Sequence, residues 1–252
     1  MSRLDTEIFT RGLAGSRSAA SAMIRNGQVT VNGRAVSKAS LDVCPGDVIA
    51  VSDGQIGKYV SRGGLKLEAI LDEAKIDPSG LLCCDIGSST GGFTDCLLKR
   101  GAAHVYAVDS GKDQLHPSLR NDARVTVMEG TNARTLDGSF LPRPADVVTM
   151  DVSFISQTLI LPVIPSLLKD GGYLLSLIKP QFEAGRGKIG KGGVVKSEAA
   201  RKEAVLKVSS CAAALGLFAE IIIESPVRGG DGNVEYLAAF VKRNPKGSDN
   251  PS

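Results

Sequence analysis

The sequence is poor in the residues that aromatic or metal-based sites need. Among its 252 residues there is no Trp, and Phe, Tyr and Trp together make up 4%. There are two His and five Cys, and none of the Cys form a CxxC pair. We therefore expect no surface dominated by aromatic stacking and no metal site, because no set of ligands has a suitable spacing. An odd number of Cys, mostly inside apolar segments, predicts reduced thiols in a reducing compartment.

Long apolar segments are also missing. The longest weakly polar run, residues 154–168, contains Ser, Gln, Thr and two Pro, whereas a membrane-spanning helix needs ~18 or more apolar residues. The first residues, MSRLDTEIFTRG, lack the apolar core of a signal peptide. We expect a cytoplasmic protein without stable membrane association, and its oligomeric state is not indicated.

Positive charge is present only in slight excess. Lys and Arg number 30 and Asp and Glu 27, which gives a net charge of +3. This balance permits an anionic partner but excludes a polycation that binds nucleic acid by charge alone. Gly is the over-used residue type, with 29 occurrences, and many of these lie in three segments near residues 87–92, 185–193 and 229–232.

Residues 1–60 are predicted to form a small α+β domain. Apolar spacing predicts helices within residues 3–12 and 16–25, and Asn32-Gly33 is a strong signal for a hairpin turn. The strings RLD, GLAGSRSAASAMIRNG and VTVNGRAVSKAS follow in an order that resembles the RNA-binding domain first described in ribosomal protein S-four. The resemblance implies that RNA is contacted by Arg3, Arg11, Ser16, Arg17, Arg25, Asn32 and Lys38.

Residues 61–243 are predicted to form an α/β domain, followed by a flexible tail at 244–252. Strands are expected at 81–86, 104–109, 125–129, 146–151, 173–179, 218–224 and 235–241. Helical or loop segments separate the first six, which predicts a mostly parallel, doubly wound, Rossmann-like sheet. A Gly-rich turn joins the last two strands, so they should form an antiparallel hairpin at the edge.

A Gly-rich turn, DIGSSTGGF at residues 85–93, follows the first of these strands. It lacks the GK[ST] of a P-loop and the GxGxxG spacing of a dinucleotide fold. Together with Asp109 at the end of the second strand, it looks like the S-adenosylmethionine site of Rossmann-like methyltransferases. A plain turn between strand and helix is the alternative. The resemblance implies that the cofactor is bound by Asp85, Gly87, Ser89, Thr90, Gly91, Gly92, Phe93, Asp109, Asn132 and Asp151.

Four charged residues are predicted to converge where the parallel strands end. Asp151 ends the fourth strand, Lys179 ends the fifth, Glu235 begins the antiparallel last strand, and Lys66 lies early in a helix that starts near residue 61. In open α/β sheets this edge is where ligands bind. The strings SRGGLK, MDVSF, KPQFE and GNVEY around these residues resemble the Lys-Asp-Lys-Glu tetrad of FtsJ-like RNA 2′-O-methyltransferases.

Taken together, the two domains resemble the TlyA (hemolysin A) family of ribosomal RNA cytidine 2′-O-methyltransferases almost end to end. The resemblance implies S-adenosylmethionine as cofactor and ribosomal RNA or ribosomal subunits as partner. Lys179 is the candidate base, with Lys66 expected to lower its pKa from ~10.4. Asp151 and Glu235 would orient the lysines and the 2′-hydroxyl.

A Gly-rich segment follows the fifth strand of the predicted sheet. Residues 183–195 contain five Gly together with Arg186, Lys188 and Lys191. Because these basic residues are spaced along a segment beside the proposed base, we expect a mobile lid that meets RNA phosphate, although a flexible connector is the plainer interpretation.

Two other functions remain open at this point. The historical name of the family suggests a hemolysin-like membrane-active protein, and the fold also allows a non-catalytic RNA-binding factor. The modified nucleotide and the ribosomal subunit that carries it are not indicated by the sequence.

Overall fold

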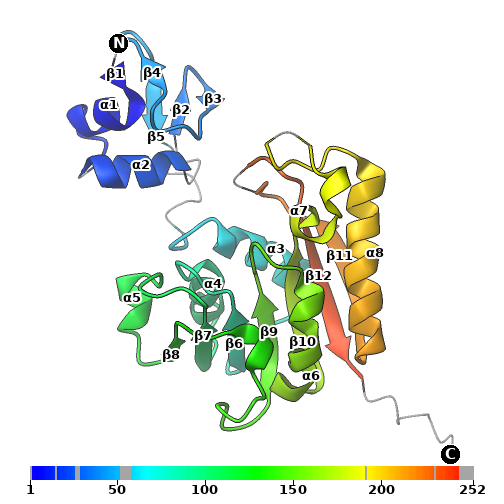
Figure 1. Ribbon diagram of the computed structural model, residues 1–252. Coiled ribbons are helices and arrows are strands. Elements are labelled where there is room, and N and C mark those ends of the chain that lie inside the picture. Colours follow the sequence, from blue (N-terminus) through cyan, green and yellow to red (C-terminus); the bar gives the residue numbers. More distant parts are fainter. Residues whose placement is uncertain are drawn as a thin grey trace, which may run out of the picture. The chain divides into compact units, whose positions relative to one another are not determined.

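The computed structural model describes residues 2–14, 16–25, 29–51, 58–190, 192–229 and 231–243, without the side chains of Ala19, Ala22, Arg25, Ala35 and Arg186. The chain divides into two compact units, Met1–Arg62 and Gly63–Ser252. Each unit has its own hydrophobic core. Figure 1 shows the elements of both.

The first unit combines two helices with short strands. Helices α1 (Leu4–Thr10) and α2 (Arg17–Arg25) pack together, and buried side chains from both join the core. All five strands form antiparallel pairs, and they are β1 (Ser2–Arg3), β2 (Val29–Val31), β3 (Arg34–Ala35), β4 (Asp42–Val43) and β5 (Ile49–Val51). Strand β2 pairs with both β3 and β5, and β1 pairs with β4.

The turn between β2 and β3 has the backbone that its sequence predicts. Asn32 and Gly33 have φ values of +51° and +77°, and Val31 pairs with Arg34 on either side of them. Two successive residues with positive φ are what a two-residue type I′ hairpin requires, and Asn-Gly accepts that backbone most readily. The hairpin prediction is confirmed.

The second unit is built on a seven-stranded sheet in the order β11-β12-β10-β9-β6-β7-β8. Its strands are β6 (Leu82–Ile86), β7 (His104–Val108), β8 (Val125–Met128), β9 (Ala145–Met150), β10 (Leu168–Ile178), β11 (Leu217–Glu224) and β12 (Tyr236–Lys242). The first five pair in parallel, and β12 pairs antiparallel with both β10 and β11. The predicted mostly parallel sheet with an antiparallel edge hairpin is confirmed.

Helices cover the sheet of the second unit. They are α3 (Gly63–Ala74), α4 (Gly92–Lys99), α5 (Pro117–Arg120), α6 (Ile164–Leu167), α7 (Pro180–Glu183) and α8 (Glu198–Ala214). Helices α6 and α8 contribute buried residues to the main core, while α3 and α4 contact each other (Figure 1). Among the described residues, no helix is both long and apolar enough to cross a membrane.

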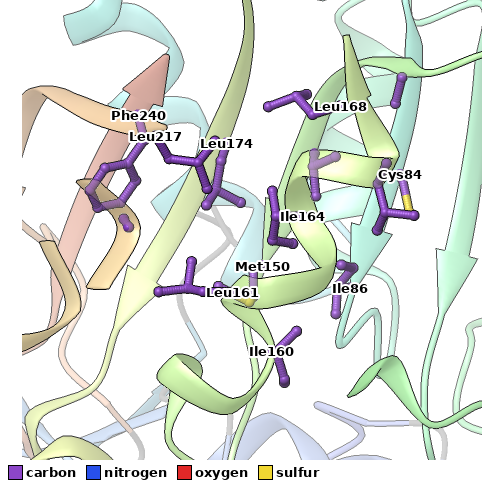
Figure 2. Packing of buried hydrophobic residues seen from close by; sticks show 14 of the residues in the cluster. Cys84, Ile86, Met150, Ile160, Leu161, Ile164, Leu168, Leu174, Leu217 and Phe240 are labelled. Atoms are coloured by element: carbon purple, nitrogen blue, oxygen red, sulfur yellow. The ribbon is translucent and has the colours of Figure 1, made fainter. Parts of the chain in front are cut away.

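The main core of the second unit fills the space between the sheet and α6. Ile86, Met150, Leu174 and Phe240 come from four different strands and are fully buried, and Ile164 of α6 packs among them (Figure 2). Their neighbours along β10 and β12 are buried as well. Because successive side chains of a strand point to opposite faces, burial of both sets means that the sheet is covered on both faces. Only its edges and strand ends are left for ligands.

Candidate active site

Two cavities lie at the carboxyl edge of the parallel strands. The larger, about 870 Å³, is lined by the ends of β6, β7 and β9 and by the loops that follow them. The smaller, about 390 Å³, is lined by Lys179, Gln181 and Glu235 together with residues of neighbouring loops. Ser153 and Phe154, just after β9, line both cavities. The two cavities therefore meet at the loop after β9.

Gly87 allows the turn after β6 to contact the end of β9. Its φ is +82°, and a Cβ atom at this position would lie 2.4 Å from the carbonyl oxygen of Asp151. The amide of Asp151 in turn donates to the carbonyl oxygen of Ile86 at 2.9 Å. Any larger residue at position 87 would push the turn away from the strand that carries Asp151.

Half of the predicted cofactor residues line the larger cavity, and half do not. Those that line it are Gly87, Ser89, Asp109, Asn132 and Asp151. Those that do not are Asp85, Thr90, Gly91, Gly92 and Phe93. In the second group, Asp85, Gly91, Gly92 and Phe93 are buried in the turn and at the start of α4, whereas Thr90 is exposed.

Asp85 is the clearest case of a predicted cofactor residue that does not line the larger cavity. Its side chain is fully buried, and its two oxygens accept hydrogen bonds from Thr94 Oγ1 and Thr149 Oγ1, each at 2.7 Å. Burial raises the pKa of Asp85 to about 6, and the two hydroxyl groups oppose that rise. Neither threonine was singled out from the sequence, because two residues so far apart carry no spacing signal.

Two carboxylates fix the loops at the rim of the larger cavity. Asp109 accepts from the backbone N–H groups of Ser89 and Gly111, at 2.8 and 2.7 Å. Glu129, which the sequence analysis did not single out, accepts from the backbone N–H groups of residues 113–115 at 2.8–2.9 Å and pairs with Arg120. These bonds hold the pKa of Glu129 at about 2, with Arg120 as the largest cause. Glu129 directly follows β8, so its position at a strand end was the available signal.

The four predicted charged residues form two ion pairs. Lys179 Nζ lies 2.6 Å from Asp151 Oδ1, and Lys66 Nζ lies 2.6 Å from Glu235 Oε2. Lys179 also donates to Ser153 Oγ at 2.8 Å. Asp151 lines the larger cavity, whereas Lys179 and Glu235 line the smaller one. An amine and a carboxylate in contact thus stand where the two cavities meet, which is an arrangement suited to proton transfer from a ligand.

Two further side chains of the smaller cavity were missed at the sequence level. Gln181 Nε2 donates to Glu235 Oε1 at 3.3 Å. Phe154 is 93% exposed with a φ of +64°, and its ring centroid lies 5.3 Å from that of Phe182. A bulky residue in the left-handed region is strained, so a Phe there is a candidate for function. The low aromatic content did not predict this pair, in which Phe154 is exposed and Phe182 is half-buried.

The Gly-rich segment after β10 is tied down at its far end. Asn233 Oδ1 accepts from the backbone N–H of Val195, and its Nδ2 donates to the carbonyl oxygen of Gly193, both at 3.0 Å. Asn233 and Val195 are both buried. Of the predicted basic contacts, Lys188 pairs with Glu203, while Lys191 and the side chain of Arg186 lie outside the described residues. A lid that moves as a whole, residues 183–195, would have to break the Asn233 bonds.

In the first unit, several predicted RNA contacts are engaged in structural bonds. Arg3 and Arg17 both approach Asp5, at 2.8 and 3.4 Å, with half of each side chain exposed. These neighbours, Arg3 first, hold the pKa of Asp5 well below its usual range. Arg11 donates to Glu7 and to two backbone carbonyl oxygens.

The remaining predicted contacts of this unit differ from one another. Asn32 bridges Asp47 and the backbone N–H of Val48, so its amide is used within the domain. Ser16 and Lys38 are exposed, and the side chain of Arg25 is outside the described residues. Among the predicted contacts, Arg3, Arg17 and Lys38 are therefore the basic side chains best placed to meet a phosphate.

Known proteins match this chain over nearly its full length. Residues 59–242 match the FtsJ-like methyltransferase family and residues 2–49 match the S4 domain. The 16S/23S rRNA (cytidine-2′-O)-methyltransferase TlyA of Mycobacterium tuberculosis is 42% identical over 93% of this chain and 88% of its own. Hemolysin A of Brachyspira hyodysenteriae is 43% identical over 95% of this chain and 99% of its own.

A solved structure gives the same result. A Streptococcus thermophilus protein described as a hemolysin is 38% identical, with a TM-score of 0.77 over 96% of this chain and 88% of its own. The chain therefore belongs to the FtsJ-like methyltransferases, within the TlyA (hemolysin A) family, and carries an S4 domain at its N-terminal end.

Proposed function

We propose that this protein transfers a methyl group from S-adenosylmethionine to the ribose 2′-hydroxyl of a cytidine in ribosomal RNA. The observation that carries the proposal is the Lys179–Asp151 ion pair, whose acid lines one cavity and whose amine lines the other. Methyl transfer needs two bound molecules, so a proton acceptor placed between two cavities suits it. The Mycobacterium tuberculosis relative is named for this reaction, which supports cytidine and ribosomal RNA as substrate.

The larger cavity fits S-adenosylmethionine in size and chemistry. Its volume of about 870 Å³ lies within the range of small-molecule sites. Asp109 follows the second strand of the sheet, where a carboxylate can accept from the hydroxyls of an adenosine ribose. Ile155, Leu159 and Ile160 supply apolar surface, and Arg134 is the one basic side chain among its described lining residues. A cavity with so few cations suits a ligand that carries no phosphate. When bound, S-adenosylmethionine supplies a methyl group on a positively charged sulfur.

In this proposal the Lys179 ammonium group first releases a proton to solvent, and the neutral amine then accepts the proton of the 2′-hydroxyl. Asp151 and Ser153 each contact its Nζ and so fix the amine at the junction of the cavities. Glu235 lines the cavity that would receive the nucleotide and is itself held by Lys66 and Gln181. Because no covalent intermediate is needed, positioning of the two reactants supplies much of the rate.

The S4 domain would bring RNA to the enzyme. Arg3, Arg17 and Lys38 present half-exposed or exposed cations. Contacts of this kind recognise phosphate geometry and RNA shape more than base sequence. We therefore assign the choice of RNA to this domain and the choice of atom to the methyltransferase domain.

The test is to incubate the protein with methyl-labelled S-adenosylmethionine and, separately, both ribosomal subunits and protein-free rRNA. Digestion to nucleosides and mass spectrometry then identify the product. We expect 2′-O-methylcytidine in at least one of the RNAs. Label on a base, or RNA binding without any label, would contradict the proposal, and the second result would favour a non-catalytic RNA-binding factor.

A further inference from the structure

Glu183 is a buried carboxylate to which the proposed reaction assigns no part. It is the last residue of α7, and its side chain is 1% exposed. Its Oε1 accepts from the backbone N–H of Gln157 at 2.7 Å, and its Oε2 accepts from Ser156 Oγ at 2.5 Å and from Lys207 Nζ at 3.2 Å. Hydrogen bonds to a carboxylate are among the stronger ones in proteins. Glu183 therefore ties residues 156 and 157 firmly to the end of α7.

The contacts of Glu183 connect the two segments that meet at the proposed reaction centre. One is the loop after β9, in which Ser153 and Phe154 line both cavities. The other is α7, which begins directly after Lys179. Ser153 Oγ accepts from Lys179 Nζ at 2.8 Å, so a contact between these segments fixes the proposed base. Glu183 itself lines neither cavity, and it can act on the reaction only through the residues that it holds.

Gln157 makes a second connection between the loop and the strand that leads to the base. Its Nε2 donates to the carbonyl oxygen of Leu177, and its Oε1 accepts from Ser176 Oγ at 2.7 Å. Both partners lie on β10, shortly before Lys179. Gln157 is buried, and its backbone N–H is the one that donates to Glu183. The loop after β9 is thus fixed to the end of β10 and to the end of α7.

Phe154 is the residue of this loop that most needs such an anchor. Its φ of +64° is costly for a bulky residue. Its side chain is 93% exposed, so packing of the ring does not account for the conformation. A strained backbone persists where the surrounding structure holds it. The bonds to Glu183 begin two residues further on, at Ser156, and so hold the strained loop from its buried side.

We propose that Glu183 is a positioning residue for methyl transfer, which anchors the loop after β9 so that Ser153 stays against Lys179. The proposal rests on the proposed function, because it concerns the same reaction. Asp151 and Ser153 both contact Lys179 Nζ. An ammonium group has three N–H positions, so these two contacts leave one position for the ribose 2′-oxygen. A loop released from Glu183 would free the amine to turn away from that oxygen.

Asp146 provides a matched control. It is also a buried carboxylate, with 6% of its side chain exposed, and it pairs with Lys169 at 2.7 Å. It accepts from the backbone N–H of Leu82 at 2.9 Å and from Arg143 at 2.7 Å. Because it lies at the start of β9, it is at the opposite end of the strand from the cavities. Asp146→Ala should therefore lower stability without changing the rate of methyl transfer per folded molecule.

The first measurement is the single-turnover rate at saturating RNA and S-adenosylmethionine, divided by the folded fraction from circular dichroism. We expect Glu183→Ala to lower this rate by about 10- to 100-fold, the size of effect that small misplacements of reacting groups produce. Glu183→Gln keeps an oxygen that can accept from the backbone N–H of Gln157, so it should lower the rate less. Asp146→Ala should leave the rate unchanged.

The second measurement asks whether Glu183 acts through Ser153. Ser153→Ala should lower the single-turnover rate by a smaller factor in the Glu183→Ala protein than in the wild type, because the contact with Lys179 is already lost there. In the Asp146→Ala protein, Ser153→Ala should have its full effect. A residue that merely stabilises the fold would give the same factor in all three backgrounds.

Hydrogen exchange tests the anchor without any variant. The backbone amide of Gln157 should be protected in the wild-type protein, and in Glu183→Gln it should exchange faster while the amide of Leu82 stays as it was. An unprotected Gln157 amide in the wild type would overturn the inference.

Two kinetic results would overturn it as well. They are an unchanged rate per folded molecule in Glu183→Ala, or in Glu183→Gln if the alanine variant does not fold while the amide of Gln157 exchanges faster, and equal factors for Ser153→Ala in the wild-type and Glu183→Ala proteins. In either case the wild type still methylates the ribose, so the proposed function stands. If the wild-type protein methylates no ribose, the proposed function fails, and the inference fails with it.

Discussion

The two ion pairs at the carboxyl edge of the sheet contain the same kinds of groups but have different surroundings. In the Lys66–Glu235 pair the two side chains are 11% and 3% exposed, and Glu235 alone lines a cavity. In the Lys179–Asp151 pair they are 11% and 23% exposed, and each partner lines a different cavity. The Lys66–Glu235 pair is the more buried and reaches one cavity through Glu235 alone, whereas the Lys179–Asp151 pair faces both proposed reactants.

This difference separates two uses of the same chemistry. A buried ion pair costs desolvation and fixes its partners in one geometry, while a pair at a cavity can exchange a proton with a ligand. Gly229 approaches Glu235 so closely that an added Cβ would lie 2.6 Å from Glu235 Oε1, so backbone also packs against the Lys66–Glu235 pair. Asp85 is a third acid near this edge, and its contacts are hydroxyl groups instead of a lysine.

The largest effect is expected from removing Lys179, the lysine of the pair that faces both cavities. Lys179→Ala should lower single-turnover methyl transfer by about 10²- to 10⁴-fold, because it removes the proposed proton acceptor. Binding of S-adenosylmethionine, measured by calorimetry, should change little, since Lys179 does not line the larger cavity. Lys202→Ala, at an exposed surface pair on α8, is the control. A Lys179→Ala protein with near-normal turnover would show that another group takes the proton.

Breaking the more buried pair, Lys66–Glu235, should lower the stability of the protein. Glu235→Ala leaves the buried Lys66 cation without a partner and should lower the free energy of unfolding by about 3–5 kcal/mol in urea titrations. The exposed pair Lys202–Glu198 offers a comparison, and Glu198→Ala should cost less than about 1 kcal/mol. The double variant Lys66→Met/Glu235→Leu should recover part of the loss. Equal costs at the two glutamates would contradict the assignment of Lys66–Glu235 as the buried pair.

Asp85 is expected to make the stability of the protein depend on pH in a definite direction. The pKa of Asp85 is raised to about 6 from 3.8, so folding favours its protonated form. Its contribution to stability is complete below about pH 4 and is lost as the pH rises through 6, by about 3 kcal/mol in total. Asp85→Asn cannot lose stability in this way. The free energy of unfolding of the variant should therefore rise relative to that of the wild type between pH 4 and pH 7. If the free energies of unfolding of the two proteins changed with pH in parallel, a raised pKa of Asp85 would be excluded.

The smallest effect is expected at Phe154, where a substitution should raise stability and lower activity. Phe154 is strained at a φ of +64° and almost fully exposed. Phe154→Gly should therefore raise the free energy of unfolding by up to about 1 kcal/mol. Methyl transfer should fall, mainly through a higher KM for RNA, because the ring that lines both cavities is lost. Phe218→Gly, at an exposed site on β11, is the control and should leave methyl transfer unchanged. Unchanged methyl transfer in Phe154→Gly would show that the ring of Phe154 takes no part in the reaction.

Much of the fold follows from local sequence signals. The strands that precede Asp151 and Lys179 are apolar runs, and the topology of a parallel sheet brings their ends together. What the sequence did not reveal depends on contacts between distant segments. An acid at a strand end looks the same whether it faces a cavity or, like Asp85, two buried threonine hydroxyls. A single Gln or Asn, such as Gln181 or Asn233, has no periodicity, so its role emerges only from its hydrogen bonds.

The position of the ribose tests the central claim most directly. A structure of the full-length protein with S-adenosylhomocysteine and an RNA fragment that contains the target nucleotide would show it. The account predicts the ribose 2′-oxygen within hydrogen-bond distance of Lys179 Nζ, about 3 Å, with the sulfur on the Asp151 side. A 2′-oxygen against the Lys66–Glu235 pair, or a base atom facing the sulfur, would contradict it.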